Sequence, residues 1–300
     1  MSASVAIVIV NWNSYEVTRQ CLDSLRTITY KNFEAVLVDN GSDDGSGEKL
    51  KAEYPEVTLL TNSTNLGFTG GNNRGIQYAL DKAHDYIMLL NNDAIATADF
   101  LGNLVTTLES DSTISAIQPK IMYDYDRTVI WNAGGRFQAF FSLMKTIGEA
   151  EKDTGQCDQP GPTQWITGCC FMIRASVVRQ IGLLDDKFFI YYEDADWSLK
   201  LRKSGRKMWY EPRAKIFHIA GMSDVNRDKH GEGNVSPFSI YQGVRNHLFI
   251  VRRYARGINL LGSWGFQIAK VTGYLIYFAF RGRFVKLRAV LRGAYHGLIQ

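Results

Sequence analysis

Four short apolar segments in the first third of the chain limit its fold more than any other feature of the sequence. These segments are VAIVIV (5–10), AVLVD (35–39), VTLL (57–60) and YIMLL (86–90). Each is rich in branched or aromatic residues, which is typical of a buried strand. Segments with helical spacing lie at 15–26, 71–83 and 99–109. Strands that alternate with helices in this way predict an α/β fold with a layered, largely parallel sheet.

Polar residues follow each of the four predicted strands. They are Asn11, Trp12 and Asn13 after the first strand, Asp39 to Asp43 after the second, Asn62 to Asn73 after the third, and Asn91, Asn92 and Asp93 after the fourth. In parallel sheets, ligands bind beyond the carboxyl ends of the strands, where the connecting loops gather. We therefore expect four loops to converge on one crevice.

The remainder of the chain divides into a mixed region and a helical tail. Between residues 114 and 173 the pattern loosens into short strands and turns, and the Gly/Pro/Gln stretch at 155–164 predicts a mobile loop. After Pro237 the chain is predicted to be helical. With 300 residues and 45% hydrophobic content, the sequence supports one large domain at 1–235 and a helical tail at 236–300.

The tail is strongly basic. Ten of the 34 basic residues follow Glu232, the last acidic residue, so residues 1–232 hold 24 basic and 30 acidic side chains. Residues 258–280 are apolar enough to touch lipid, but Gln267 and Lys270 interrupt them, which favours an interfacial helix over a membrane span. Such a tail would suit an anionic cytoplasmic leaflet. In the alternative, its apolar face packs on the rest of the chain or on a second copy, as a homodimer.

The amino terminus, the cysteines and the distribution of basic residues indicate the compartment and the partners of the protein. The amino terminus has no positively charged leader, and the four cysteines show neither the paired spacing of a zinc site nor the density of a disulfide scaffold. We expect a cytoplasmic protein that is peripheral on the inner face of the plasma membrane. Since no basic and aromatic stripe crosses the expected crevice, we expect no nucleic-acid partner.

Asp39 and the glycine-rich loop at 62–76 are candidates for binding a nucleotide. A carboxylate directly after a buried strand can accept hydrogen bonds from a uracil or thymine imide or from a ribose hydroxyl. The alternative is that the Asp, Asn, Gly and Ser residues around it only form a turn. The four glycines of the loop allow close backbone approach and open a helix whose N-terminus favours anions, which supports a ligand.

Asn91, Asn92 and Asp93 follow a wholly apolar strand, where Asp93 can present an oxygen ligand to the crevice. A divalent cation held by one or two carboxylates plus diphosphate oxygens is normal for magnesium or manganese. The alternative is that Asp93 caps the next helix, although later residues are better placed to do so. His218 ends another predicted strand; a lone histidine is usually structural, but here it is a reasonable further ligand.

The strongest local signal is YYEDADW (191–197), which has three carboxylates within four positions and flanking aromatic residues. On a helix, Glu193 and Trp197 share a face, whereas Asp194 and Asp196 project elsewhere. One of these acids can face the crevice as a base. The alternative is that the acids decorate a helix N-terminus and suit its dipole.

Taken together and in this order, these motifs resemble family 2 inverting glycosyltransferases of the GT-A fold, especially the bacterial rhamnosyltransferase-like branch. The matching stretches, which cover roughly residues 5–223, are VAIVIVNWNS, VLVDNGSDDGS, NLGFTGGNNRGI, MLLNNDA, WITGCCFMIR, FFIYYEDADWSLKLRKSG and HIAGMS. The resemblance implies a GT-A (Rossmann-like) mixed sheet flanked by helices. It also implies a nucleotide-diphospho-sugar donor and a role in cell-wall or polysaccharide biosynthesis.

The resemblance further implies roles for individual residues. Those implied to lie at the donor are Asn11, Asn13, Asp39, Asn40, Gly70, Gly71, Asn72, Asn73, Asn91 and Asn92. Asp93 would match the last carboxylate of the family's DxD metal motif, whose first aspartate is replaced here by Asn91. His218 would match the histidine that can join Asp93 on Mn²⁺ or Mg²⁺.

The implied reaction is a single displacement with inversion. Asp194 would match the catalytic aspartate, taking a proton from the acceptor hydroxyl as that hydroxyl attacks the anomeric carbon. Candidates for a sugar or acceptor wall are Trp165, Gly168, Glu193 and Trp197, and the flat surfaces of the two tryptophans suit the C–H faces of sugars. In the alternative, Trp165 belongs to the core. The branch suggests rhamnose, carried by dTDP, as the sugar, and the basic tail points to a lipid-linked or glycan acceptor.

Two other functions compete with this reading. A nucleotidyltransferase also binds nucleotide and metal on an α/β sheet, but it needs a basic glycine-rich loop after the first strand, where this sequence has NWNSYE. The second is a catalytically silent sugar-nucleotide-binding or scaffold protein. Retention of both Asp93 and Asp194 argues against a silent protein.

Overall fold

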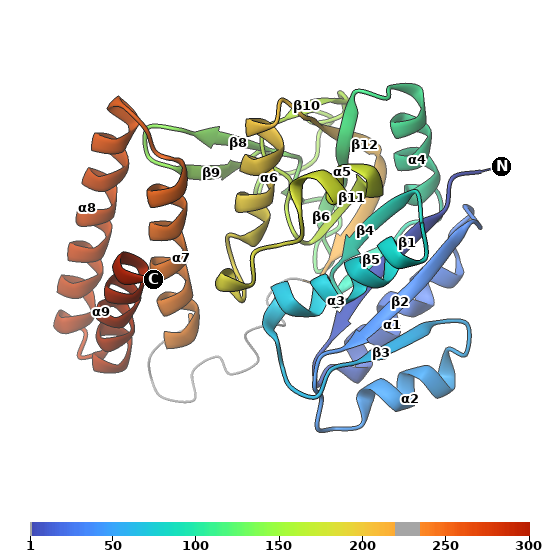
Figure 1. Ribbon diagram of the computed structural model, residues 1–300, viewed down its shortest axis with the longest axis horizontal. Helices are drawn as coiled ribbons and strands as arrows, with labels where there is room; N and C mark the ends of the chain where they lie inside the picture. Colours follow the sequence, from blue (N-terminus) through green and yellow to red (C-terminus); the bar gives the residue numbers. More distant parts are fainter. Residues whose placement is uncertain (1, 220–234) are drawn as a thin grey trace.

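The four predicted strands form the parallel half of one sheet in a computed structural model that describes residues 2–219 and 235–300 (Figure 1). These strands are β1 (Val5–Asn11), β2 (Phe33–Asp39), β3 (Thr58–Thr61) and β4 (Tyr86–Leu90). They lie in the order β3-β2-β1-β4, and all three pairings are parallel. All four carboxyl ends therefore meet at one edge of the sheet, as expected from the sequence.

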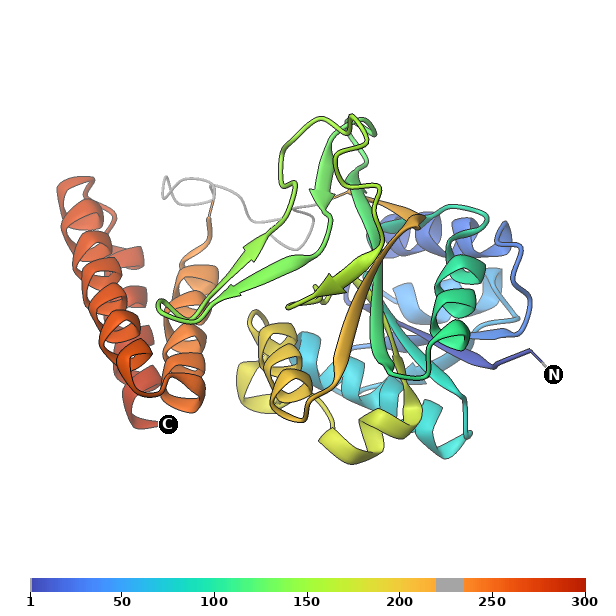
Figure 2. The same cartoon turned by 90° about the horizontal axis from the view of Figure 1, so that it is seen from above.

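The other half of the sheet is mixed, which confirms the looser pattern predicted after residue 114. Its strands are β6 (Ile114–Tyr123), β7 (Ile130–Asn132), β10 (Gly161–Thr163), β11 (Cys170–Arg174) and β12 (Lys207–His218), with the short β5 (Ala94–Ala96) paired to β12. β11 is antiparallel to both β4 and β6, whereas β12 is parallel to β6. A separate hairpin, β8 (Gly135–Gln138) and β9 (Leu143–Thr146), projects from this half (Figure 2).

Helices cover both faces of the sheet because the buried strands are apolar on both sides. In β1, Val5, Ile7 and Ile9 enter one core and Ala6 and Val8 enter the other. The first core is covered by α1 (Tyr15–Arg26), α2 (Ser46–Glu53) and α4 (Phe100–Ser110). The second is covered by α3 (Gly67–Asp81), α5 (Ala175–Ile181) and α6 (Glu193–Lys203). This is the mixed α/β architecture predicted from the sequence.

The contact of α3 with β1 depends on a glycine. A Cβ atom added to Gly75 would lie 2.3 Å from Cγ1 of Val8, far inside van der Waals contact. Gly75 therefore lets the helix sit directly on the strand, and its role is close packing. Gly71 has the same role one turn earlier, since a Cβ there would lie 2.8 Å from Cγ1 of Val10.

Three helices form the C-terminal part of the chain. They are α7 (Pro237–Tyr254), α8 (Ile258–Phe280) and α9 (Phe284–Ile299). Ser236 caps the N-terminus of α7, since its side chain accepts a hydrogen bond from the Ser239 amide, and Pro237 is the first residue of the helix. Gly293 lets α9 approach α7 closely, because a Cβ there would lie 2.8 Å from the carbonyl oxygen of Tyr241.

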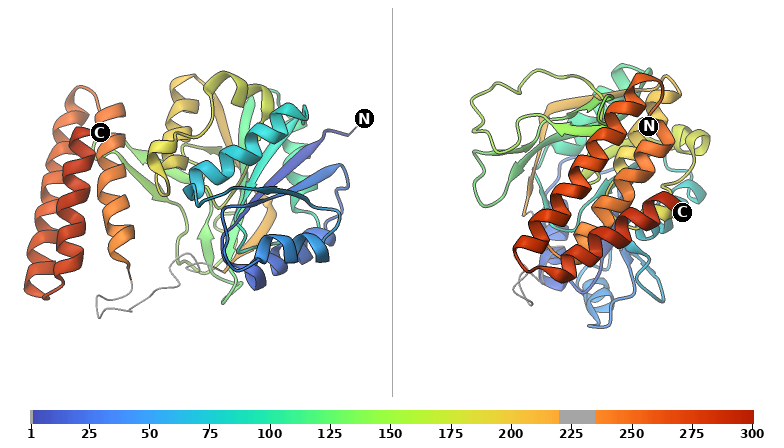
Figure 3. Two further views of the ribbon diagram at one scale, coloured as in Figure 1. Left: turned by 60° about the horizontal axis from the view of Figure 1, so that its bottom comes forward. Right: turned by 90° about the vertical axis from the view of Figure 1, so that its left-hand side faces the viewer.

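The C-terminal helices are attached to the sheet domain through α7 and through the β8–β9 hairpin. Figure 3 shows α8 and α9 at the end of the molecule far from β1 to β3. Ser142, in the hairpin, and Ser263, in α8, are joined by a hydrogen bond of 2.8 Å between their hydroxyls. In residues 2–219 and 235–300, no helix is both long enough and apolar enough to cross a bilayer. The division predicted between residues 235 and 236 remains a prediction.

Candidate active site

Asp39 lies at the carboxyl end of β2, within a network of polar side chains. The Asn11 amide donates to Asp39 Oδ1 at 3.1 Å, and the Ser42 hydroxyl donates to the same oxygen at 2.5 Å. Asn11 is fully buried and its own carbonyl oxygen accepts from Thr18 at 2.8 Å. Since both bonds to Asp39 use Oδ1, Asn11 orients this carboxylate, and the prediction that Asn11 itself touches the donor is corrected to a supporting role.

Asn40 has a similar supporting role for the loop that leads into α3. Its Oδ1 accepts from the Asn62 amide at 3.0 Å and from the Leu66 backbone at 3.2 Å, and its Nδ2 donates to the Gly67 carbonyl at 3.0 Å. Asn40 is buried, and these bonds use both its side-chain oxygen and its side-chain nitrogen. Asn13, in contrast, is exposed at the rim, and its backbone amide donates to the Ser42 hydroxyl at 3.0 Å.

The first turns of α3 lie against the turn that precedes α6. The Thr69 amide donates to the carbonyl of Phe189 at 3.0 Å, so one of the free amides of this helix N-terminus is already used. Asn73 donates to Leu184 O at 2.9 Å and to Asp186 at 2.8 Å, while Asn72 donates to Phe68 O at 2.8 Å. Asn73 therefore joins α3 to the segment before α6, whereas Asn72 bonds within α3. Gly70 is partly exposed and stays a candidate for close approach of the donor.

Asp93 and His218 are brought together by the pairing of β5 with β12. His218 pairs with Ala94 in this ladder, and the Ile219 amide donates to the carbonyl of Asp93 at 2.9 Å. Asp93 Oδ1 and His218 Nε2 are 3.0 Å apart but are too poorly aligned for a hydrogen bond. The indole of Trp131 packs edge-on against the imidazole, with 4.5 Å between ring centroids.

The donor atoms of this pair fit a divalent cation. Asp93 Oδ1 and both ring nitrogens of His218 are buried without a hydrogen-bond partner in the part of the chain that the structure describes. Buried polar atoms without partners are costly, and a metal ion would satisfy them. Across residues 2–219 and 235–300, no three His, Cys, Asp or Glu side chains gather in a metal-binding arrangement. Mg²⁺ and Mn²⁺ commonly take only one or two protein ligands and complete their coordination with substrate oxygens and water.

Asp194 lies in the first turn of α6 and is held by backbone amides. Gly168 donates to its Oδ2 at 2.9 Å, and Ala195 donates to its Oδ1 at 2.7 Å. Burial raises the pKa of Asp194 above its usual range, and these two amides oppose that rise. The carboxylate is thereby held in place with a strengthened affinity for a proton.

Glu193 has a different environment from its neighbour. It is 5% exposed, and its Oε2 is buried without a hydrogen-bond partner among the described residues. Burial and the adjacent Asp194 charge raise the pKa of Glu193 well above its usual range. The Gly168 and Ala195 amides hold the Asp194 carboxylate, whereas the pKa of Glu193 is raised further by burial and by the Asp194 charge, so Asp194 is the member of the pair that ionises more readily.

Backbone contacts join the Asp93 and Asp194 regions. The Asn91 amide donates to Cys169 O at 2.8 Å, and the neighbouring Gly168 donates to Asp194. The Asp93 charge also helps to raise the pKa of the buried Cys169 thiol, after the larger effect of burial, so Asp93 lies near Cys169. The two predicted carboxylates therefore gather at the same edge of the sheet. Asn92 points elsewhere, donating to Thr18 at 2.9 Å.

The two tryptophans predicted to form a sugar wall have different surroundings. Trp165 is partly exposed, and its indole N–H lies beside Asp194 and helps to lower the pKa of that carboxyl. Trp197 has no exposed surface; it packs on Phe171 and donates to Gly182 O at 3.0 Å. The prediction of a wall at Trp197 is therefore wrong, because position 197 of α6 faces the core under the sheet.

Sequence reasoning missed the turn that positions the Glu193–Asp194 pair. Phe189, Tyr191 and Tyr192 have φ angles of 60°, 69° and 72°, in the left-handed region that side chains other than glycine rarely adopt. Asn246, in α7, bonds to this turn. Local sequence patterns gave no sign of the turn, since it contains no glycine or asparagine.

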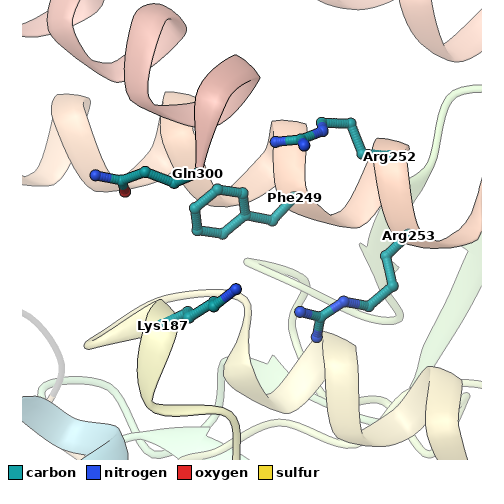
Figure 4. Close-up of a pocket in the computed structure, with 5 residues that line it drawn as sticks. All are labelled: Lys187, Phe249, Arg252, Arg253 and Gln300. Carbon is teal, nitrogen blue, oxygen red and sulfur yellow. The ribbon is translucent and has the colours of Figure 1, made fainter.

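Two cavities lie apart from the predicted site residues. One of about 250 Å³ is lined by Lys187, Phe249, Arg252, Arg253 and Gln300, between α7 and the segment before α6 (Figure 4). Another of about 700 Å³ lies at the amino ends of β1 and β4, where Ser4, Asp85 and Tyr86 line it. Neither cavity includes Asp93 or Asp194.

The site geometry can be compared with known proteins. A family model described as "Glycosyl transferase family 2" matches residues 6–182. The low-salt glycan biosynthesis hexosyltransferase Agl10 of Haloferax volcanii is 28% identical over 99% of this chain and 92% of its own length. The N-acetylglucosaminyl-diphospho-decaprenol L-rhamnosyltransferase of Mycobacterium tuberculosis is 26% identical over 73% of this chain and 76% of its own length. The dTDP-rhamnosyl transferase RfbF of Shigella flexneri is 22% identical over 84% and 81%.

A solved structure has the same fold. The crystal structure of GalNAc-T7 with UDP, GalNAc and Mn²⁺ superposes with a TM-score of 0.64 at 20% identity, covering 83% of this chain. This chain spans 48% of that protein, so the likeness concerns the fold.

Proposed function

Because this chain belongs to glycosyl transferase family 2 and is rhamnosyltransferase-like, we propose that it transfers a sugar with inversion from a nucleotide-diphospho-sugar to a lipid-linked or glycan acceptor. One observation carries the mechanistic part of this proposal. The Asp194 carboxylate is fixed by two backbone amides at the sheet edge where Asp93 and His218 also lie. A site of this kind can hold a base on one side of a sugar and a diphosphate on the other.

Asp194 acts as the general base. Its raised pKa gives the carboxylate the proton affinity needed to accept a proton from the acceptor hydroxyl during attack on the anomeric carbon. The bond from the anomeric carbon to the diphosphate breaks as the new glycosidic bond forms, so no covalent intermediate with the protein is required. Glu193, whose pKa is raised by burial and by the adjacent Asp194 charge, and the partly exposed Trp165 would line the sugar or acceptor side.

Asp93 and His218 would hold Mn²⁺ or Mg²⁺, with the diphosphate supplying further oxygens. The cation would neutralise charge that develops on the departing diphosphate. Two protein ligands fit the replacement of the first DxD carboxylate by Asn91, since fewer protein oxygens leave more positions for phosphate and water.

Asp39 would bind the donor nucleotide through Oδ2, with Asn11 and Asn40 holding the surrounding loops. The names of the similar proteins include an L-rhamnosyltransferase and a dTDP-rhamnosyl transferase. We therefore take dTDP-rhamnose as the first donor to test.

The exposed face of α8 and α9 would bind an anionic membrane surface. Gln267 and Lys270, which interrupt the apolar run in the sequence, point inward: Gln267 is 2% exposed, and Lys270 Nζ lies 2.9 Å from His247 Nδ1. The outward side of α8 keeps a stripe of Leu261, Ile268, Ile276 and Phe280.

α9 adds a second apolar face with positive charge. It exposes Phe284, Leu291, Tyr295, Leu298 and Ile299, and the exposed Arg288 and Arg292 lie among them. An apolar face edged by arginines matches the chemistry of an anionic leaflet. A lipid-linked acceptor would then reach the crevice from the same surface.

Transfer assays test this function. The wild-type chain is incubated with Mn²⁺ or Mg²⁺ and a panel of nucleotide-sugars that includes dTDP-rhamnose, with a polyprenyl-diphosphate sugar as acceptor, and the product anomer is assigned by NMR. Asp194→Asn and Asp93→Ala are expected to lose transfer, whereas Asp81→Asn, the same chemical change at the exposed end of α3, should not. Wild-type turnover in both active-site variants, or retention of configuration, would contradict the proposal.

A further inference from the structure

The turn that leads into the catalytic pair has an unfavourable backbone. Phe189, Tyr191 and Tyr192 all have positive φ angles, between 60° and 72°. Left-handed conformations crowd the Cβ atom of an L-residue, so such a turn persists only where surrounding groups hold it. Tyr192 is the last residue before Glu193, and its carbonyl accepts the Asp196 amide in the first turn of α6. The direction in which α6 starts, and so the position of Asp194, depends on this turn.

Asn246, in the middle of α7, forms hydrogen bonds with the backbone of the turn. Its side chain is fully buried, and its Nδ2 donates to the carbonyls of Phe188 at 2.9 Å, Ile190 at 2.9 Å and Tyr191 at 2.8 Å. An amide NH₂ has two hydrogens, so at least one of them is shared between two carbonyls. Its Oδ1 accepts from the Arg245 guanidinium at 2.9 Å, which fixes the orientation of the amide.

Other contacts hold the same turn from its remaining sides. Arg245 donates to Lys187 O at 2.7 Å and to Phe188 O at 3.1 Å. The Tyr192 ring stacks on His247 of α7, with 5.2 Å between centroids and an angle of 20°. On the opposite side, the Thr69 amide of α3 donates to Phe189 O. The turn is therefore held between α3 on one side and α7 on the other.

α7 also fixes the body of α6. Arg253 contacts Asp196 at 2.6 Å and Asp185 at 2.7 Å, and the Tyr254 hydroxyl donates to Asp196 at 2.8 Å. Figure 4 shows Arg253 projecting from α7 toward the segment that carries α6. Both the start and the first turns of α6 are therefore anchored to α7.

We propose that Asn246 is a positioning residue for catalysis, which holds the left-handed turn at 189–192 and thereby aims Asp194 at the acceptor hydroxyl. The inference rests on the proposed function, in which Asp194 is the base. It gives α7 a part in positioning the base, whereas α8 and α9 would bind the membrane surface. A base displaced by about 1 Å loses roughly 100-fold in rate, because proton transfer and attack need aligned atoms.

The test compares Asn246→Leu, which keeps the volume but removes every donor, with Asn246→Ser, which keeps one donor. We expect kcat to fall by about 100-fold in Asn246→Leu and by less in Asn246→Ser. The KM for the nucleotide-sugar and the Kd for the free nucleotide should stay within about threefold, since the hydrogen bonds of Asn246 go to the turn and to Arg245 and not to Asp39 or Asp93.

A matched control separates positioning from loss of stability. Val244 is also buried in α7, but it faces Gly293 of α9 and not the turn. Val244→Ala should lower the Tm while leaving kcat near the wild-type value. If Asn246→Leu does not fold, the ratio of kcat between Asn246→Ser and Val244→Ala variants of similar Tm gives the same comparison.

The outcomes distinguish the two proposals. Loss of transfer in Asp194→Asn together with wild-type kcat in a folded Asn246→Leu protein would overturn the positioning role and leave the function intact. Equal falls in kcat for Asn246 and Val244 variants of equal Tm would also overturn it. Wild-type transfer by Asp194→Asn would instead overturn the proposed function.

Discussion

Removal of the apolar stripe on α8 should release this protein from anionic membranes. The perturbation is the triple change Ile268→Ser, Ile276→Ser and Phe280→Ser. These side chains are 66%, 66% and 89% exposed, so the change removes little packing within the protein. Thermal unfolding should therefore stay close to wild type, which makes the variant a clean probe of the surface.

The size of the effect follows from these exposures. Full burial of a Leu, Ile or Phe side chain contributes about 1.5–3 kcal/mol. About three-quarters of each side chain is free to be covered, and an interfacial helix sinks only partway into the acyl boundary, burying roughly half of that surface. Three residues then contribute about 2–3 kcal/mol, which corresponds to a loss of roughly 30- to 150-fold in vesicle affinity.

Flotation with vesicles of phosphatidylcholine and phosphatidylglycerol measures this affinity on the full chain. Tyr125→Ser, which removes a side chain that is 74% exposed on the sheet domain, is the control and should float like the wild type. Raised salt should weaken binding of the wild type because it screens the arginines of α9. Equal flotation of the triple variant and the wild type would refute the reasoning. A change in oligomeric mass without vesicle binding would show that the stripe covers a second copy.

Four further results are expected. Asp194→Asn should lower kcat by about 10²- to 10⁴-fold with nucleotide binding retained, as measured by steady-state kinetics and calorimetry. In the wild type, activity should fall as the pH drops through a value above the ordinary aspartate range, because the base must be ionised and its pKa is raised; an acidic limb at or below that range would contradict the assignment. Asp93→Ala should raise the Mn²⁺ concentration needed for half-maximal rate by at least about 10-fold, with unchanged metal response as the contrary result. Arg253→Leu should destabilise the protein by about 1–3 kcal/mol in urea unfolding, since the buried Asp196 loses one of its two cationic partners and keeps Lys200, and a change under about 0.5 kcal/mol would contradict this.

The strand and helix pattern could be predicted because it is encoded by local periodicity. β1, β2 and β4 begin and end within two residues of the predicted segments, and α1 spans the predicted range. The helix α2 (Ser46–Glu53) was not predicted, because SGEKLKAE has one large apolar residue and no apolar face of its own. Leu50 is fully buried in the core, and this tertiary contact stabilises the helix.

The sequence by itself determined which loops carry the polar residues, because loops that follow parallel strands must open at one edge of the sheet. Whether a polar side chain in such a loop faces outward or inward depends on contacts with segments distant in the chain. Asn40 and Trp197 belong to the expected motifs but are buried by such contacts, whereas Asp194 is partly exposed and held by the Gly168 amide.

Only the tertiary structure decided how the C-terminal helices relate to the site. The charge and apolar content of residues 236–300 suggested a separate tail. Yet Asn246 and Arg253, two ordinary polar residues of an amphipathic helix, contact the turn and the helix that carry Asp194. Hydrogen bonds between segments far apart in sequence leave no periodic trace, so folding alone brings them together.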